Sequence, residues 1–210
     1  MRSFHLLPCV VATAFALAAC NSTRVASTSG PVSTSAATVA AAAAPSAAPA
    51  CAADAALTPA ETEGPYFKAG SPERANLVEA GMSGTKLTVS GIVRAGGCTP
   101  VAHALIDVWQ ADATGAYDNV GYRLRGHVFT DAEGRYSFQT VVPGEYPGRT
   151  PHVHVKVQAP NGPVLTTQLY LPGIASNTRD GIFQPQMLLQ DVQTSPSGMT
   201  ARYDFTIGKS

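Results

Sequence analysis

Charge is scarce in this chain and balanced in sign. Only 13% of the 210 residues are charged, and 14 Lys and Arg residues oppose 14 Asp and Glu residues, so the formal net charge is zero. The Lys and Arg residues do not cluster anywhere along the sequence. Binding to nucleic acid needs a basic face that neutralises phosphates, so this composition argues against nucleic acid as a partner.

The chain also lacks an apolar run long enough to span a bilayer comfortably. Its most apolar stretch, residues 1–19, has a basic Arg2 near its start and small residues at its end, just before Cys20. Such a run is typical of a cleaved signal rather than a membrane-spanning helix. It resembles a bacterial lipoprotein signal peptide in which Cys20 becomes the acylated first residue. We therefore expect an exported lipoprotein anchored to a membrane through Cys20, on the periplasmic or surface face of the bacterial outer membrane.

Residues 20–50 follow the signal with almost no charge and little variety. After the lipidated Cys20 they consist almost entirely of Ser, Thr, Ala, Val and Pro, and Arg24 is the sole charge. This composition predicts a flexible tether. A short helix over residues 36–44, ended by Pro45, is the alternative. We expect the globular domain to occupy residues 51–210.

Cysteine is limited to four residues. Cys9 would be removed with the signal and Cys20 would carry lipid, which leaves Cys51 and Cys98. Two cysteines exported to an oxidising compartment are expected to pair. We predict a disulfide between Cys51 and Cys98 that ties the start of the domain to the loop before the strand of Trp109. Two unrelated buried thiols are the alternative.

Helical periodicity is nearly absent from residues 51–210, apart from one turn expected near residues 71–75. Short alternating or β-branched runs are separated by turn signals, of which Ala159-Pro160-Asn161-Gly162 is the strongest. The expected strands cover residues 85–93, 104–110, 126–130, 135–140, 151–158, 164–171 and 202–207. This pattern predicts an all-β domain, a β-sandwich of about seven to eight mostly antiparallel strands. The same architecture serves binding modules and enzymes, so function must be inferred from a site.

The segment from Tyr146 to His154 holds three side chains that could bind a metal, Tyr146, His152 and His154, together with the positive charge of Arg149. The two histidines are two residues apart in an expected strand, so their imidazoles should leave one face while the intervening valines leave the other. Taken alone, the pair is also compatible with the polar side of an ordinary amphipathic strand.

Two tyrosines make a metal site the stronger interpretation. Tyr146 precedes the histidine pair, and Tyr117 stands in a Gly-x-Tyr sequence after the strand 104–110, with Tyr122 as a rival. A free phenol has a pKa of about 10, so a tyrosinate ligand implies a highly charged cation, ferric iron rather than zinc. Two imidazoles and two phenolates would neutralise most of a trivalent charge. They would also leave coordination positions open for a chelating substrate such as a catecholate.

These residues, and others in the same order along residues 57–192, resemble the intradiol ring-cleavage dioxygenases, the family of protocatechuate and catechol dioxygenases. The matching pieces are Thr58-Pro59, Thr62-Glu63-Gly64-Pro65-Tyr66, Cys98-Thr99-Pro100, residues 104–110, Gly115-Ala116-Tyr117, Leu124-Arg125-Gly126, Thr130-Asp131, Gly134, Val142-Pro143-Gly144, residues 146–154 and Thr166-Thr167-Gln168. Our chain would be a single-domain, exported lipoprotein form of that family.

The resemblance implies a set of site residues. Tyr117, Tyr146, His152 and His154 would hold a non-haem Fe(III) ion, and Tyr146 would leave the metal to act as a base. Arg149 would lie beside the bound ring and stabilise negative charge on it. Gln168 would line the substrate pocket. Without the resemblance, Arg149 is equally compatible with a solvated loop charge, and Gln168 with an outward-facing strand residue.

The expected function is that of a dioxygenase. It would cleave a catechol-type ring between its two hydroxylated carbons and place both atoms of O₂ in a muconate-type diacid. Its partners would be a small aromatic diol, O₂ and, through Cys20, a membrane. Two alternatives stay open. One is a metal-free β-sandwich binding module on a lipid tether, and the other is a copper- or zinc-binding protein that uses only the histidine pair.

Overall fold

The computed structural model describes residues 55–96 and 98–208. The signal peptide at residues 1–19, the tether at residues 20–50 and the anchoring Cys20 lie outside the described residues, so these expectations stay predictions. Cys51 lies outside them too. Cys98 is disulfide-bonded, but its pairing with Cys51 also stays a prediction. Within the described part of the chain, no helix is long and apolar enough to cross a membrane.

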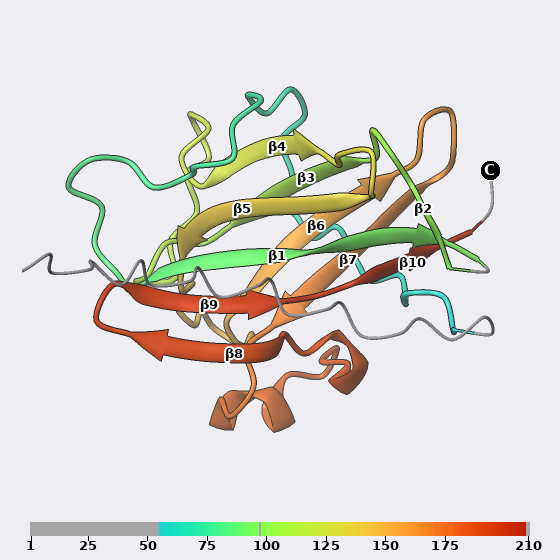
Figure 1. Ribbon diagram of the computed structural model, residues 1–210. Helices are drawn as coiled ribbons and strands as arrows, with labels where there is room; N and C mark the ends of the chain where they lie inside the picture. Colours follow the sequence, from blue (N-terminus) through green and yellow to red (C-terminus); the bar gives the residue numbers. More distant parts are fainter. Residues whose placement is uncertain (1–54, 97, 209–210) are drawn as a thin grey trace, which may run out of the picture. The chain divides into compact units, whose positions relative to one another are not determined.

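The described residues form ten strands in two sheets (Figure 1). One sheet follows the order β10-β1-β9-β8, with β2 and β5 also paired to β1, and the other follows β4-β3-β6-β7. Strand β1 runs parallel to β9 and β10, and the other pairs are antiparallel. The strands are β1 (Lys86–Ala95), β2 (Thr99–Pro100), β3 (Leu105–Gln110), β4 (Arg125–Phe129), β5 (Arg135–Val141), β6 (His152–Gln158), β7 (Val164–Tyr170), β8 (Gln190–Ser195), β9 (Gly198–Arg202) and β10 (Phe205–Ile207).

The prediction of an all-β sandwich is confirmed, and six expected strands coincide with β1 and β3 to β7 within two residues. The expected strand 202–207 is divided, because β9 ends at Arg202 and β10 begins at Phe205. Strand β8 is almost wholly exposed and polar, so it lacks the apolar alternation that signals a strand. The turn expected near residues 71–75 is wrong. The short helices are η1 (Ala175–Arg179) and η2 (Pro185–Met187).

The hydrophobic core lies between the two sheets. Strand β6 contributes Val153, Val155 and Val157, none of which is exposed to solvent. They belong to the same buried cluster as Leu87 and Val89 of β1. Alternation along a strand puts these valines on one face and the histidines on the other, as the sequence predicted. Burying each such side chain contributes about 1.5–3 kcal/mol to folding.

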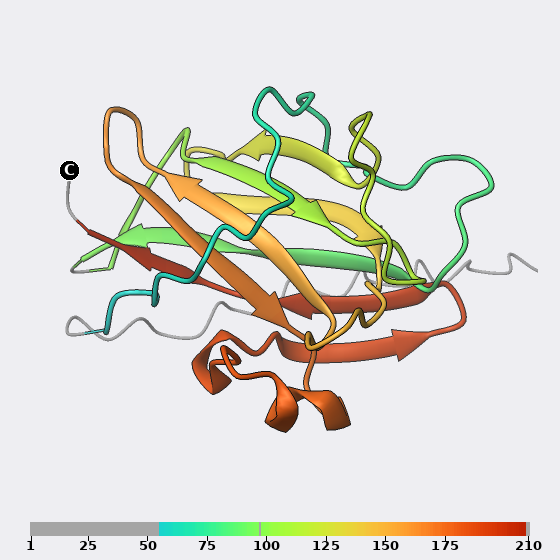
Figure 2. The same ribbon diagram turned by 180° about the vertical axis from the view of Figure 1, so that it is seen from behind.

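The histidine face of the four-stranded sheet is also covered. The chain segment 58–68 crosses β6 and β7 on this side, as Figure 2 shows. Its backbone is held by a hydrogen bond from Glu61 N to Thr166 O of 2.8 Å. His152 and His154 are therefore only 2% and 1% exposed. The polar face of an amphipathic strand has become a second interior, from which water is largely excluded.

The core assignment predicts a specific stability difference. Val155→Ala removes two methyl groups from the packed face of β6 and should lower the free energy of unfolding by about 2 kcal/mol. Val164→Ala at the start of β7, where the side chain is 49% exposed, should change it by less than about 0.5 kcal/mol. Urea unfolding of the purified domain measures both values, and equal losses would contradict the assignment.

Candidate metal centre

The register of β6 with its neighbours assembles one polar group on the covered face. His154 lies opposite Trp109 of β3 and Gln168 of β7, and His152 lies opposite Tyr170. Directly opposed residues of antiparallel strands point to the same side of a sheet. Two strands that the sequence separates widely thus place three more functional side chains beside the histidine pair.

The two imidazoles converge through their Nε2 atoms, which are 3.1 Å apart. The Nδ1 atom of His152 lies 2.7 Å from the carbonyl oxygen of Thr150. A proton on Nδ1 donates to that carbonyl, so the Nε2 lone pair is free to bind a metal. His154 is stacked on the indole of Trp109, with ring centroids 4.7 Å apart and planes 4° apart. Both rings are therefore fixed in orientation.

Burial also keeps both histidines neutral. It lowers the pKa of His152 to about 4, with a further contribution from the nearby Arg149 cation. Burial and the neighbouring His152 hold the pKa of His154 well below its ordinary value. A neutral imidazole is the form that binds a metal.

Two loops bring tyrosine oxygens to the same place. Tyr117 lies in the loop from β3 to β4, and Tyr146 in the loop from β5 to β6. Tyr146 Oη is 3.3 Å from His152 Nε2. The rings of Tyr117 and His154 are 6.4 Å apart, and the buried Tyr117 Oη has no hydrogen-bond partner among the described residues. The rival Tyr122 instead donates to Ala69 O at 2.9 Å.

Close backbone contact holds the two tyrosine loops together. Gly144 N donates to Asp112 O at 2.8 Å. Gly115 has a φ of +87°, and a Cβ at this position would lie 2.1 Å from Glu145 O. Only glycine combines this left-handed backbone with so near an approach. The glycine of the Gly-x-Tyr sequence therefore sets the distance between the loops that carry Tyr117 and Tyr146.

The donor set suits a highly charged metal ion. The described residues contain no group of three or more His, Cys, Asp and Glu side chains that could hold a metal, so a metal here would need the tyrosine oxygens. Burial raises the pKa of Tyr117 above its ordinary value. An ionised phenolate at this position thus requires a neighbouring cation. Two neutral imidazoles, Tyr146 and the unpartnered Tyr117 oxygen fit Fe(III) better than Zn²⁺.

Arg149 is fixed beside these donors by three side chains. Its Nε donates to Asp180 Oδ2 at 2.9 Å, Nη1 donates to Tyr146 Oη at 3.3 Å, and Nη2 donates to Gln168 Oε1. Asp180 is 7% exposed, and Gln168 is fully buried. Arg149 is therefore not a solvated loop charge, and Gln168 is not an outward-facing strand residue. Arg149 contacts the predicted ligand Tyr146, and Gln168 contacts Arg149.

Several residues of the site were not among the predicted site residues. Tyr66 stacks on Tyr117 with ring centroids 4.3 Å apart. Asp180 follows Arg149 by 31 residues, a separation that only the folded chain closes.

Cavities of about 110 Å³ and 350 Å³ flank the donors, the first lined by Tyr146, Arg149 and Asp180 and the second by Tyr117. A small aromatic molecule would reach the donors from such openings.

Fold and site together define a β-sandwich with a buried cluster of His and Tyr donors that suits a metal ion. Residues 62–207 match the family model described as Dioxygenase. The chain is 34% identical over 158 residues to catechol 1,2-dioxygenase 2 of Acinetobacter lwoffii, covering 60% of this chain and 58% of the relative. It is 37% identical over 119 residues to the protocatechuate 3,4-dioxygenase beta chain of Burkholderia cepacia, covering 48% and 51%. The chain thus spans little more than half the length of these curated relatives.

A solved structure matches more completely. The dioxygenase domain of a dioxygenase carbohydrate-binding protein fusion from Streptomyces sp. SirexAA-E is 49% identical, with a TM-score of 0.71, over 74% of this chain and 100% of that chain. The 3-chlorocatechol 1,2-dioxygenase from Rhodococcus opacus 1CP is 29% identical, with a TM-score of 0.67, over 73% of each chain. The chain belongs to the intradiol ring-cleavage dioxygenase family.

The contact at Gly115 predicts a loss of metal binding. Gly115→Ala should separate the two tyrosine loops, because the new methyl group meets Glu145 O, and should destabilise the domain by at least about 1–2 kcal/mol. Gly148→Ala is the matched control. Its φ is +79°, but a Cβ there meets nothing within 4 Å. Iron stoichiometry should fall only in Gly115→Ala, and equal retention in both variants would contradict this role of Gly115.

Proposed function

We propose that this protein is a non-haem Fe(III) dioxygenase that cleaves a catechol-type ring between its two hydroxylated carbons, giving a muconate-type diacid. The observation that carries the proposal is the convergence of His152 Nε2, His154 Nε2 and Tyr146 Oη beside the unpartnered Tyr117 oxygen. Family membership supports it. The relatives are named for catechol, hydroxyquinol and protocatechuate, which are all aromatic rings with adjacent hydroxyl groups.

Ferric iron, when bound, would supply a Lewis acid for the two diol oxygens and accept electron density from the ring. Tyr117 is the more firmly held oxygen ligand, because Tyr66 stacks on its ring. Tyr146 is less enclosed, and its Oη lies 3.3 Å from both Arg149 Nη1, which donates to it, and His152 Nε2. Burial raises the pKa of Tyr146, so a Tyr146 phenolate would be a base able to take a proton from the substrate.

Arg149 supplies a fixed positive charge next to Tyr146. Its guanidinium is oriented by Asp180 and lies against Tyr146, where a diol that displaces this phenol would bind. A cation fixed there stabilises negative charge as it develops on the ring. The neutral histidines add no charge of their own, so the Arg149 cation is opposed mainly by Asp180.

The alternatives differ in what they require of the tyrosines. A binding module would leave the Tyr and His side chains as ordinary surface, whereas His152 and His154 are almost fully buried. A copper or zinc protein that uses only the histidine pair would bind its metal without Tyr117 or Tyr146. Tyrosine variants therefore distinguish the proposal from the second alternative.

Tyr117→Phe and Tyr146→Phe should each abolish or shift the red tyrosinate-to-iron absorption and lower catechol turnover by about 10²–10⁴-fold. The measurement is the visible spectrum of the iron-loaded domain before and after anaerobic addition of catechol, followed by O₂ uptake. Tyr122→Phe is the control and should match the unaltered protein in both. A colourless unaltered protein after iron loading would refute the proposal. Full metal binding in both tyrosine variants would favour the histidine-only alternative.

We also propose that the domain is held on the bacterial outer membrane by lipid attached to Cys20. The supporting observations are the signal-like residues 1–19 and the small residues before Cys20. Cys20→Ser should move the protein from the membrane fraction to the soluble fraction when cells are separated by centrifugation. Continued membrane association in that variant would contradict a lipid anchor at Cys20.

A further inference from the structure

A half-buried carboxyl lies one hydroxyl group away from Gln168. Glu61 belongs to the segment that crosses the histidine face, and its Oε2 accepts a hydrogen bond from the Tyr170 hydroxyl at 2.5 Å. Its other oxygen, Oε1, is buried and has no partner among the described residues. Burial raises the pKa of Glu61 to about 7 in spite of the Tyr170 hydrogen bond and the Arg149 charge. Both protonation states of this carboxyl are therefore accessible near neutral pH.

The Tyr170 hydroxyl connects Glu61 to the pocket glutamine. Its oxygen lies 2.5 Å from Glu61 Oε2 and 3.2 Å from Gln168 Oε1, with Ile182 O farther away at 3.4 Å. A phenol has one proton to donate, so it can serve only one of these acceptors at a time. An ionised Glu61 is the strongest acceptor and takes that proton. A protonated Glu61 donates to the Tyr170 oxygen instead, and the phenol proton turns to Gln168.

Gln168 passes this change to the guanidinium. Its Nε2 donates to Thr62 O at 3.0 Å, which fixes the orientation of the amide. Its Oε1 then faces both Arg149 Nη2 and the Tyr170 hydroxyl. When Glu61 is ionised, two oxygens face each other at 3.2 Å without a hydrogen between them, and Gln168 accepts from Arg149 alone. When Glu61 is protonated, Gln168 accepts from both.

We propose that Glu61 is a positioning residue of this site: its protonation is relayed through the Tyr170 hydroxyl to Gln168, and it changes how far the Arg149 cation is offset where it faces a bound ring. The inference rests on the proposed function for the identity of that ring. The relay from Glu61 to Gln168 is independent of the proposed function, because it is a property of the metal-free protein.

The charges around Glu61 give the direction of the effect. The groups that face it are Tyr170 from β7, Arg149 from the loop before β6, Asp180 after η1 and Tyr203 between β9 and β10. With Glu61 protonated, Asp180 alone opposes the Arg149 cation. With Glu61 ionised, a second carboxylate does so, and the attraction for an anionic catecholate falls. Binding should therefore weaken as the pH rises through about 7.

The first test uses the metal-free domain and NMR of the Gln168 side-chain amide, with signals identified from a Gln168→Leu variant. In the unaltered protein these signals should move with pH and show a midpoint near 7. Glu61→Gln should abolish that movement. Tyr170→Phe should also abolish it, because the charge is still present but the hydroxyl that relays it is not. Movement that persists in Tyr170→Phe, or is equal in Glu61→Gln and the unaltered protein, would overturn the relay.

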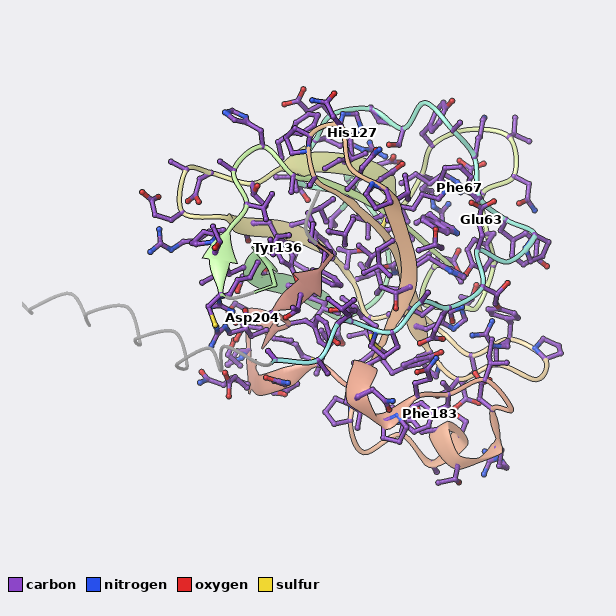
Figure 3. All side chains as sticks on the ribbon, turned by 90° about the vertical axis from the view of Figure 1, so that its right-hand side faces the viewer. Glu63, Phe67, His127, Tyr136, Phe183 and Asp204 are labelled. Carbon is purple, nitrogen blue, oxygen red and sulfur yellow. The ribbon has the colours of Figure 1, made fainter. Side chains whose placement is uncertain are left out.

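Glu63→Gln is the matched control. Glu63 lies two residues from Glu61, but its carboxylate is paired with Lys156 at 2.5 Å, and Lys156 also lies 3.5 Å from the centre of the Phe67 ring. Figure 3 labels Glu63 and Phe67 on this segment, and Phe183, which packs against Tyr170, near the short helices. Glu63→Gln should leave the movement of the Gln168 amide signals with pH unchanged. A lost titration in this variant would show that any change in the segment disturbs the amide, and would overturn the specific role of Glu61.

Stability gives a second metal-free measurement. The pKa of Glu61 is raised from 4.5 to about 7 by folding, so the protonated form is favoured in the native state. Its contribution is fully present below pH 4.5 and is lost as the pH rises towards 7. The free energy of unfolding of Glu61→Gln should therefore rise relative to the unaltered protein across this window. A constant difference would show that Glu61 does not titrate there and would overturn the proposal.

The iron-loaded protein tests the consequence for the site. The ratio of 4-nitrocatechol dissociation constants, unaltered protein over Glu61→Gln, should increase about fivefold or more as the pH rises through 7. A flat ratio in a protein that binds the probe would overturn the coupling to Arg149. A protein that binds neither iron nor the probe would refute the proposed function. The pH dependence of the Gln168 amide signals would still decide whether the relay from Glu61 exists.

Discussion

Two imidazole nitrogens that face each other across 3.1 Å, where almost no water reaches them, are the central constraint of this structure. The proton on Nδ1 of His152 is committed to the Thr150 carbonyl, so its Nε2 lone pair has to be satisfied by something else. A cation would relieve this arrangement most completely, because it accepts both lone pairs at once. The tyrosine loops, Trp109 and the covering segment all pack around this pair.

The sandwich divides its work between the two faces of one sheet. The valines of β6 stabilise the fold from one side, while the histidines of the same strand organise chemistry on the other. Strand alternation thus lets neighbouring residues serve unrelated purposes. The cost is a polar second interior, whose donors and acceptors must be matched to one another. Arg149, Gln168, Asp180 and Tyr170 form the network that achieves this on the His152 side.

The sequence revealed the parts of this site that are local in the chain. The His152 and His154 pair follows from a period of two, and Tyr117 from its position after glycine at the end of a strand. Nothing comparable marked Asp180, Tyr170 or Glu61, because each acts through a partner brought close only by strand pairing or by the crossing segment. The same limit applies to the fold. Buried strands showed apolar alternation, whereas the exposed strand β8 did not.

The complete site requires the segment 58–68, although this segment contains no strand. All ten strands lie after it, since β1 begins at Lys86. Yet it contributes Tyr66 against Tyr117, Glu61 against Tyr170, and Gly64, where an added Cβ would lie 3.4 Å from the His154 ring. A fragment that began at β1 would open one wall of the His and Tyr cluster to water and would also lose Leu77, which is fully buried in the core. The complete site therefore needs a chain that begins well before the first strand, at or before residue 58.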